Sequence, residues 1–201
     1  MVGLNLTGGA KITGGALQLT TGSQNQTTSA YYSTPVYIGA FTTEFDLRLS
    51  TPASSTSGEG ITFVIQNAGS TALGSGGDGL GYAGIPNSAA IKFNIFNSAG
   101  QGNDSTGLYL HGATPTVPSI DLTSSGIELG SGHLIHVTVT YEGTTLTWTL
   151  KDTVNSLKVF EQVAVNLPHA IGSNTAYVGF TGAEGDGATI QNILDWTFTS
   201  P

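Results

Sequence analysis

The dominant feature of the 201-residue chain is a strict alternation of hydrophobic and polar positions. In residues 41–50 the odd-numbered positions are mainly Phe and Leu, whereas the even-numbered positions are Thr, Glu, Asp, Arg and Ser. Because successive side chains of a strand point to opposite faces of a sheet, this pattern predicts a half-buried β-strand. The same period predicts further strands within residues 61–65, 91–95, 135–141, 146–150 and 194–198.

Clusters of Gly, Ser, Asn and Pro separate these runs and predict loops at residues 53–60, 68–79, 97–105 and 182–187. Glu142 and Gly143 predict a hairpin turn. The best helix candidate, residues 155–163, also fits a strand with Leu157, Val159 and Glu161 on one face. Since no linker or repeat divides the sequence, we expect one domain, residues 1–201, with an all-β fold: an antiparallel sandwich.

Composition narrows the function classes. Charged residues make up 9% of the chain, and 5 Lys and Arg oppose 13 Asp and Glu, which gives a net charge of −8. The lack of a basic surface argues against a nucleic-acid partner, and the absence of Cys excludes disulfides and thiolate metal sites. No apolar run approaches the roughly 18 residues of a membrane span, so we expect no membrane insertion. The first residues also lack the basic start and apolar core of a signal peptide.

The sequence offers little support for catalysis. A glycosidase needs two carboxylates facing each other across a cleft, but Glu44 and Asp46 lie on one predicted strand face, which favours a solvated surface. His133 and His136 are expected on opposite strand faces and so cannot bind one metal together. The glycine-rich run at residues 74–81 lacks the lysine and the following helix of a phosphate-binding loop. We therefore predict that the protein is not an enzyme.

Isolated acidic and amide side chains are concentrated in the predicted loops. Glu59 lies between two glycines, Asp78 lies in the glycine-rich run, and Glu184 and Asp186 lie near the end of the chain. Such groups hydrogen-bond in the fixed directions that sugar hydroxyls require, and an aromatic ring can cover the apolar face of a sugar. The alternative, which composition alone favours, is that Gly, Asn and Asp occur there because they tolerate turns.

Several segments together, in their order and spacing, resemble the L-type, legume-lectin-like domains and, within them, the bacterial branch. They are residues 6–12 and 16–20, 32–36, 41–45, 58–65, 79–82, 87–94, 178–180 and 193–198. The resemblance covers essentially the whole chain. It implies a jelly-roll sandwich with a flat back sheet, a curved front sheet and a sugar site on loops at one edge of the front sheet.

The resemblance also implies particular site residues. The sugar-binding Asp of the family falls on Glu59, the backbone donor of the glycine loop falls near Asp78, and the C-terminal specificity loop falls on residues 184–187. The Asn that binds both sugar and calcium falls on Ser98, next to Asn97. The predicted carbohydrate-binding residues are therefore Glu59, Asp78, Phe96, Asn97, Ser98, Asp186 and Gly187.

The metal positions depart from the family pattern. The Asp shared by calcium and the transition metal falls on Asn94, the transition-metal Glu falls on Lys92, and the metal-binding His falls near Ser105. A protonated Lys cannot ligate a metal and repels a divalent ion, so we expect no manganese site. Calcium usually needs six to eight oxygens with carboxylates among them, and only one of the candidate ligands is anionic. These candidates are Asn94, the Phe96 carbonyl, Ser98 and Asp104.

The sequence thus predicts at most a weak calcium site. The alternative is a loop held by pairing of Lys92 with Asp104 or by amide hydrogen bonds. We expect a non-catalytic carbohydrate-binding domain that is secreted or at the cell surface, with a homodimer as a further expectation from the family. The competing prediction is a structural or adhesive module that has lost sugar binding, because Lys92, Asn94 and Ser98 replace family site residues.

Overall fold

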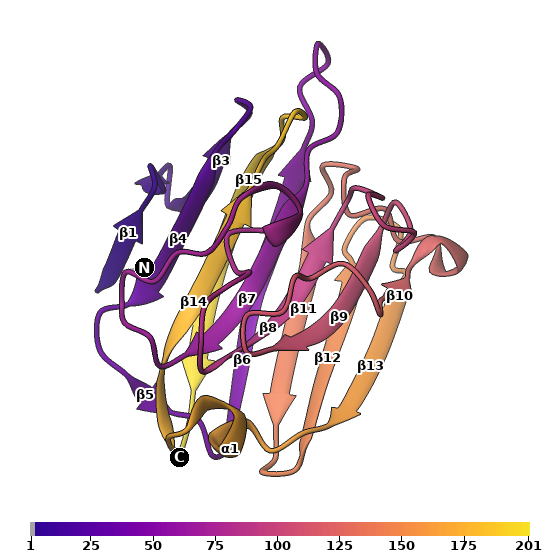
Figure 1. The fold of residues 1–201 in the computed structure, drawn as a ribbon. Helices are drawn as coiled ribbons and strands as arrows, with labels where there is room; N and C mark the ends of the chain where they lie inside the picture. Colours follow the sequence, from indigo (N-terminus) through magenta and orange to yellow (C-terminus); the bar gives the residue numbers. More distant parts are fainter. Residues whose placement is uncertain (1–2) are drawn as a thin grey trace.

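A computed structural model describes residues 3–201 and shows two antiparallel sheets packed face to face as a sandwich (Figure 1). The back sheet has the order β13-β12-β11-β6-β15-β3-β2, and the front sheet has the order β1-β4-β14-β7-β8-β9-β10, with β5 paired to β14. The fold class predicted from the alternating pattern is confirmed. No helix within residues 3–201 has the length and apolar character needed to cross a membrane.

The strands are bounded as follows. The back sheet contains β2 (Lys11–Thr13), β3 (Ala16–Thr21), β6 (Phe41–Ser50), β11 (Ile135–Tyr141), β12 (Thr145–Asp152), β13 (Lys158–Ala164) and β15 (Ile190–Thr199). The front sheet contains β1 (Leu4–Thr7), β4 (Thr27–Tyr32), β5 (Val36–Tyr37), β7 (Gly60–Gln66), β8 (Ser88–Asn94), β9 (Ser105–Leu110), β10 (Ile120–Asp121) and β14 (Thr175–Ala183). The short helices are η1 (Gly77–Gly79), η2 (Thr123–Ser125) and α1 (Leu167–Ile171).

The back sheet follows the predicted alternation. In β6, Phe45 and Leu47 are fully buried against the front sheet, while Glu44 and Asp46 face outward. The Asp46 carboxylate lies 2.8 Å from Nδ1 of His136 on the neighbouring strand. Glu44 and Asp46 therefore lie on the outer surface of a sheet and not across a cleft. This confirms the prediction that they form part of a polar strand face.

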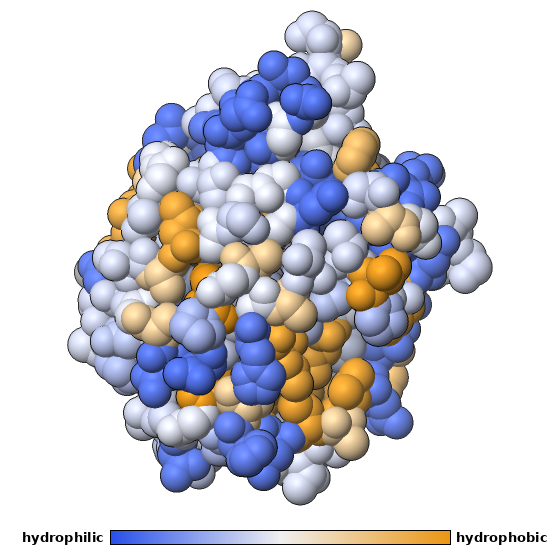
Figure 2. Space-filling view, in the orientation of Figure 1, coloured by the Kyte–Doolittle hydropathy of each residue, from blue (hydrophilic) through white to orange (hydrophobic). Residues whose placement is uncertain are grey.

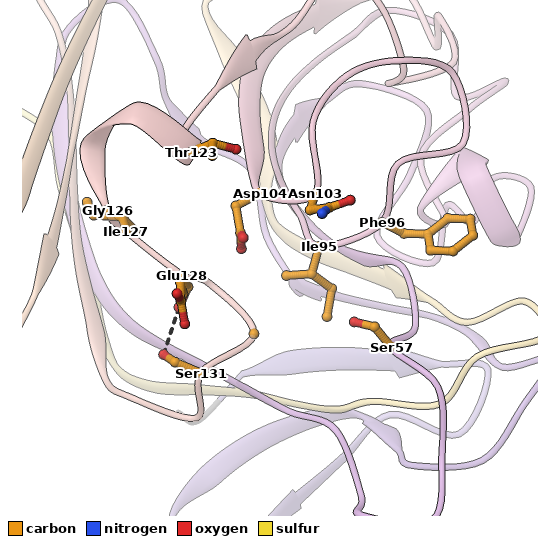
Figure 3. A pocket seen from close by; sticks show the side chains of 11 residues that line it. Ser57, Ile95, Phe96, Asn103, Asp104, Thr123, Gly126, Ile127, Glu128 and Ser131 are labelled. Carbon is orange, nitrogen blue, oxygen red and sulfur yellow. Dashed lines mark hydrogen bonds between the residues drawn. The ribbon is translucent and has the colours of Figure 1, made fainter.

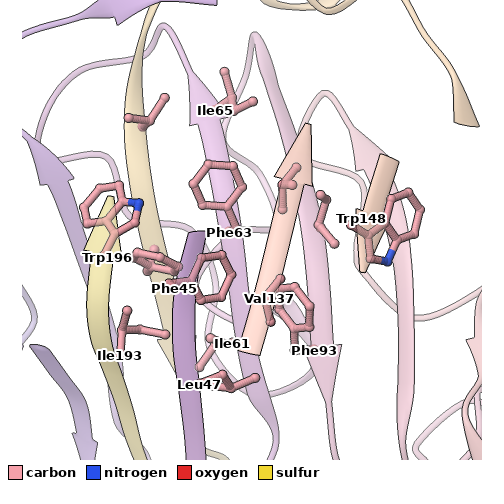
Figure 4. Packing of buried hydrophobic residues seen from close by; sticks show 14 of the residues in the cluster. Phe45, Leu47, Ile61, Phe63, Ile65, Phe93, Val137, Trp148, Ile193 and Trp196 are labelled. Carbon is pink, nitrogen blue, oxygen red and sulfur yellow. The ribbon is translucent and has the colours of Figure 1, made fainter. Parts of the chain in front are cut away.

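The central strands of the front sheet are buried on both faces. Every residue of β7 and β8 is buried. Phe63 and Phe93 pack into the main core between the sheets, where Phe45 lies 6.0 Å and 5.9 Å from them, centroid to centroid (Figure 4). On the opposite face, Val64 and Ala90 belong to a second, smaller cluster with Tyr31 of β4, Tyr109 of β9 and Tyr82 of the β7–β8 connection. This double burial explains the nearly continuous hydrophobic character of these strands.

Two local predictions were wrong. The sequence placed Leu194, Trp196 and Phe198 on one face, but a bulge between Leu194 and Thr197 shifts the register, so Ile193 replaces Leu194 in the core. The pattern also predicted no helix, whereas the short helix α1 forms. The side chain of Asn166 caps its start by accepting a hydrogen bond from the His169 amide at 3.0 Å. Five residues are too few to show a helical period.

Candidate functional site at the loop edge

Three connections, and the glycine-rich residues 74–81 of a fourth, meet at one end of the sandwich, at the top of Figure 1, where hydrophilic residues also gather on the face shown in Figure 2. The Ile95 amide donates to the Glu59 carbonyl at 2.9 Å, which ties the β8–β9 connection to the start of β7. A side chain at Gly187 would collide with the Ser57 carbonyl, so the β14–β15 connection also packs against this segment. The connections comprise residues 51–59, 67–87, 95–104 and 184–189.

Glu184 is the buried centre of this edge. It is 1% exposed, and its Oε1 accepts hydrogen bonds from Gln191 Nε2 at 2.6 Å and from Thr20 Oγ1 at 3.3 Å. Its Oε2 accepts from the Glu59 amide at 3.3 Å and lies where a side chain on Gly58 would project. One carboxylate thus joins β3, β15 and the residue before β7. Burial raises the pKa of Glu184 to about 7, although these hydrogen bonds oppose the shift.

Glu59 is the most unusual side chain at the edge. It is 7% exposed, and its Oε2 is buried without a hydrogen-bond partner among residues 3–201. Burial raises the pKa of Glu59 to about 7, and the negative charge of Asp78 adds to the increase. Gly185 passes so close that a Cβ there would lie 3.3 Å from Oε1. A buried carboxylate oxygen without a donor is costly, so Glu59 is the carboxyl group at this edge that a hydrogen-bonding ligand would stabilise.

Asp78 and Asp186 surround Glu59 from two sides. Asp78 is exposed in η1, and Gly185 lies between this helix and Glu59, since a Cβ on Gly185 would be 3.8 Å from the Gly77 α-carbon and 3.3 Å from Glu59 Oε1. Asp186 is exposed, and its backbone carbonyl accepts a hydrogen bond from the side chain of Gln24. It lines a separate hollow of about 330 Å³ with residues 54–56. The structure therefore brings Glu59 and Asp78 together and places Asp186 at the outer rim.

The β8–β9 connection is held by side-chain amides. Asn94 Nδ2 and Gln101 Nε2 donate to the Phe96 carbonyl at 2.8 Å and 3.1 Å. Asn97 Oδ1 accepts from the Gly100 amide at 2.8 Å, which makes a local turn. The Phe96 ring is 41% exposed, and Asn97 and Ser98 are exposed beside it. These three predicted sugar-binding residues are accessible, while the carbonyl expected to bind calcium is occupied by two amides.

Asp104 does not join the other predicted calcium ligands. Ser105 pairs with Asn94 across β8 and β9, so the preceding residue, Asp104, points to the opposite face of the sheet. Its Oδ1 accepts from the Leu129 amide at 2.7 Å, and its side chain lines a hollow of about 580 Å³ with Glu128 and Ile95 (Figure 3). Burial raises the pKa of Asp104, and hydrogen bonds from Leu129 and Gly130 oppose this increase.

Lys92 occupies the position at which the resemblance expected a transition-metal Glu. It is fully buried, its Nζ donates to the Thr116 carbonyl at 2.7 Å, and it lies 5.4 Å from the centroid of the Tyr109 ring. Burial lowers the pKa of Lys92 to about 8, and the charge of Asp78 opposes the decrease. Lys92 does not pair with Asp104, whereas amide hydrogen bonds, the other means of holding the loop that the sequence left open, are present.

The residues at the family metal positions do not fit a metal pair. Within residues 3–201, no group of three or more His, Cys, Asp or Glu side chains could hold a metal ion. Asn94 Oδ1 and Ser105 Oγ are buried and lack partners in the described part of the chain, but both are neutral oxygens. With buried Lys92 on the same face of β8 as Asn94, the surroundings disfavour a divalent cation.

The burial of two residues that organise this edge was not predicted from the sequence. Gln101 is 2% exposed although its neighbours in the connection are Gly, Ala and Asn. Glu184 was noticed as a loop acid, but its role as a buried connector was not. No local pattern distinguishes a buried Gln in a glycine-rich loop from an exposed one. For Glu184, the predicted loop at residues 182–187 begins too early. Strand β14 continues through Gly182 and Ala183, so Glu184 directly follows a buried strand.

Comparisons with known proteins agree with this architecture. The legume lectin domain family matches residues 2–201. The L-type lectin-domain containing receptor kinase I.7 of Arabidopsis thaliana is 30% identical over 224 residues, covering 98% of this chain and 33% of the kinase. The chain thus spans about a third of the length of the curated relatives it matches.

Solved structures show the same fold. A Lotus tetragonolobus seed lectin superposes with a TM-score of 0.85 at 20% identity, over 100% of this chain and 94% of the lectin. Peanut lectin with a 9mer peptide gives 0.82 at 20% identity, over 99% and 93%. Because the family model matches residues 2–201, nearly the whole chain, the protein belongs to the legume lectin domain family.

Proposed function

We propose that this domain is a non-catalytic lectin that binds a sugar over Glu59 at the loop edge. The observation that carries the proposal is the buried Glu59 Oε2, which has no donor among residues 3–201. Sugar hydroxyls supply such donors, and they gain from a carboxylate that is already fixed in place. The lectins among the family relatives support carbohydrate binding in general.

The surrounding residues have distinct roles in this proposal. Asp78 and Asp186 accept further hydroxyl hydrogen bonds, and the exposed ring of Phe96 covers an apolar sugar face. Asn97 and Ser98 contact the sugar from the β8–β9 connection. Gly187 can contribute only its backbone, and a side chain at this position would collide with the Ser57 carbonyl.

A glycan array with the wild-type protein and Glu59→Ala tests the proposal. We expect at least one class of glycan to bind the wild type and its signal to fall about tenfold or more in the variant, since a buried acceptor is lost. Glu44→Ala is the matched control, because Glu44 is an exposed carboxylate on the outer face of the back sheet. Equal binding by wild type and Glu59→Ala would refute the site.

The second candidate function is a structural or adhesive module without sugar binding. The observation that favours it is the neutral or cationic character of the family metal positions, Lys92, Asn94 and Ser98. Failure of the folded wild-type protein to bind any glycan on the array at high concentration would support this candidate over the lectin.

The proposal also covers location and assembly. We propose a secreted or cell-surface domain of bacterial type, following the sequence resemblance, and a homodimer formed through a back sheet or an edge strand. Light scattering after size exclusion tests the assembly. A mass twice that of the 20.5 kDa chain supports the dimer, and the mass of one chain contradicts it.

A further inference from the structure

We propose that the side-chain amides of Gln101 and Asn94 take the place of calcium as the group that fixes the β8–β9 connection. The connection, residues 95–104, is then ordered without any metal. For the sugar-binding role of the connection, this inference rests on the proposed function. The clamp itself is a property of the unliganded protein.

The Phe96 carbonyl is the centre of the clamp. A carbonyl oxygen has two lone pairs, and here two amide N–H groups approach it, at 2.8 Å from Asn94 and 3.1 Å from Gln101. A calcium ion would have to displace both donors, and Asn94 Nδ2 would then lose the one acceptor that it has within residues 3–201. Unpaired buried amides are costly, so the clamp competes directly with the ion.

Gln101 is built into the connection through both ends of its amide. Its Nε2 also reaches Ser98 Oγ at 3.3 Å, while its Oε1 accepts from the Ala99 amide at 2.8 Å. The side chain is 2% exposed, so water does not replace these bonds easily. One neutral side chain therefore positions Phe96 and Ser98, two of the predicted sugar contacts.

The surrounding charges favour the amides over a cation. Lys92 is buried on the same face of β8 as Asn94, and Asp104 points to the other face, where it is bound to the Leu129 amide. A divalent ion near Phe96 would therefore meet a positive charge and neutral oxygens, in contrast to the carboxylate-rich sites that calcium prefers.

Hydrogen exchange of the free protein, read by mass spectrometry over residues 95–104, tests the clamp without any sugar. For the wild type we expect equal protection in EDTA and in millimolar calcium. Gln101→Leu keeps the volume but removes the hydrogen bonds, and we expect exchange in this segment to rise about tenfold or more, with β11 and β12 unchanged. Asn103→Ala is the matched control, because Asn103 is an exposed amide of the same connection that makes no side-chain hydrogen bond within residues 3–201.

Two results would overturn the proposal. One is wild-type protection that rises with calcium and is lost in EDTA. The other is unchanged protection in Gln101→Leu, which would show that packing and not the amide holds the connection. If the wild type binds a glycan, Gln101→Leu should weaken that binding severalfold in EDTA. If no glycan binds, the proposed function fails, but the exchange measurements still decide the clamp.

Discussion

The two halves of the candidate site use opposite chemistry. Around Glu59 and Glu184, carboxylates are buried, their pKa values are raised to about 7, and one oxygen has no partner among residues 3–201. Around Phe96 and Gln101, the groups are neutral amides whose hydrogen bonds close within the connection itself. We call these the acidic half and the amide half.

The acidic half has an unsatisfied acceptor that a ligand can use, whereas the amide half is ordered by its own hydrogen bonds. Buried amides that hydrogen-bond within a loop rigidify it, whereas an unpartnered buried carboxylate raises the free energy of the unliganded protein by about 1–3 kcal/mol. A sugar that donates to Glu59 relieves that strain. We therefore expect the acidic half to control affinity and pH dependence, and the amide half to control position.

The largest expected effect comes from breaking the centre of the acidic half. Glu184→Ala leaves the Glu59 amide without an acceptor, removes one of the two acceptors of Gln191 Nε2 and opens a cavity in a buried site, so we expect a loss of about 3 kcal/mol in the free energy of unfolding. Urea denaturation measures it. Glu184→Gln, which keeps the shape and one acceptor, should lose less than half as much. A loss below about 1 kcal/mol in Glu184→Ala would contradict its connecting role.

The next effect is the pH dependence of the acidic half. Because the pKa values of Glu59 and Glu184 lie near 7 in the folded protein and near 4.5 when unperturbed, the folded state binds more protons between these values. Stability should therefore fall as pH rises from 5 to 8, by about 2 kcal/mol.

Thermal or urea unfolding across this pH range measures the slope. The double variant Glu59→Gln, Glu184→Gln should flatten it, since neither amide titrates. A wild-type stability that rises steadily with pH over the same interval would show that the two carboxyl groups are not held protonated in the fold.

A smaller effect should come from Lys92, the titratable neighbour of Asn94 on β8. Its pKa is lowered to about 8 in the folded protein and is 10.5 when unperturbed, so the unfolded chain binds the extra proton between these values. Stability should rise by about 1 kcal/mol as pH increases from 8 to 10. Lys92→Met should remove this rise. If the stability of Lys92→Met rises between pH 8 and 10 as much as that of the wild type, Lys92 is not the group responsible.

Much of the fold could be predicted because one face of the back sheet is exposed to solvent and the other is buried. The alternation of polar and hydrophobic residues therefore shows which side chains of each strand face the core. The prediction for Leu194 was wrong because a bulge shifts the alternation by one residue, and no local sequence pattern indicates the bulge. At the site, the resemblance to the legume-lectin-like domains implied that Glu59 and Asp78 belong to one edge of the front sheet. The direction of Asp104 could not be predicted, because this residue lies in the connection just before β9 and its direction depends on how β9 pairs with β8. The role of Gln101 could not be predicted, because it depends on hydrogen bonds that form only when the connection has folded.

The most direct test of the central claim is an NMR titration of backbone amides with the best glycan from the array, in a buffer containing EDTA. We predict shifts centred on Glu59, Asp78, Gly185 and residues 96–98, with the β11 and β12 amides unchanged. Shifts centred on the back sheet, or shifts at the loop edge that appear only after calcium is added, would contradict the account.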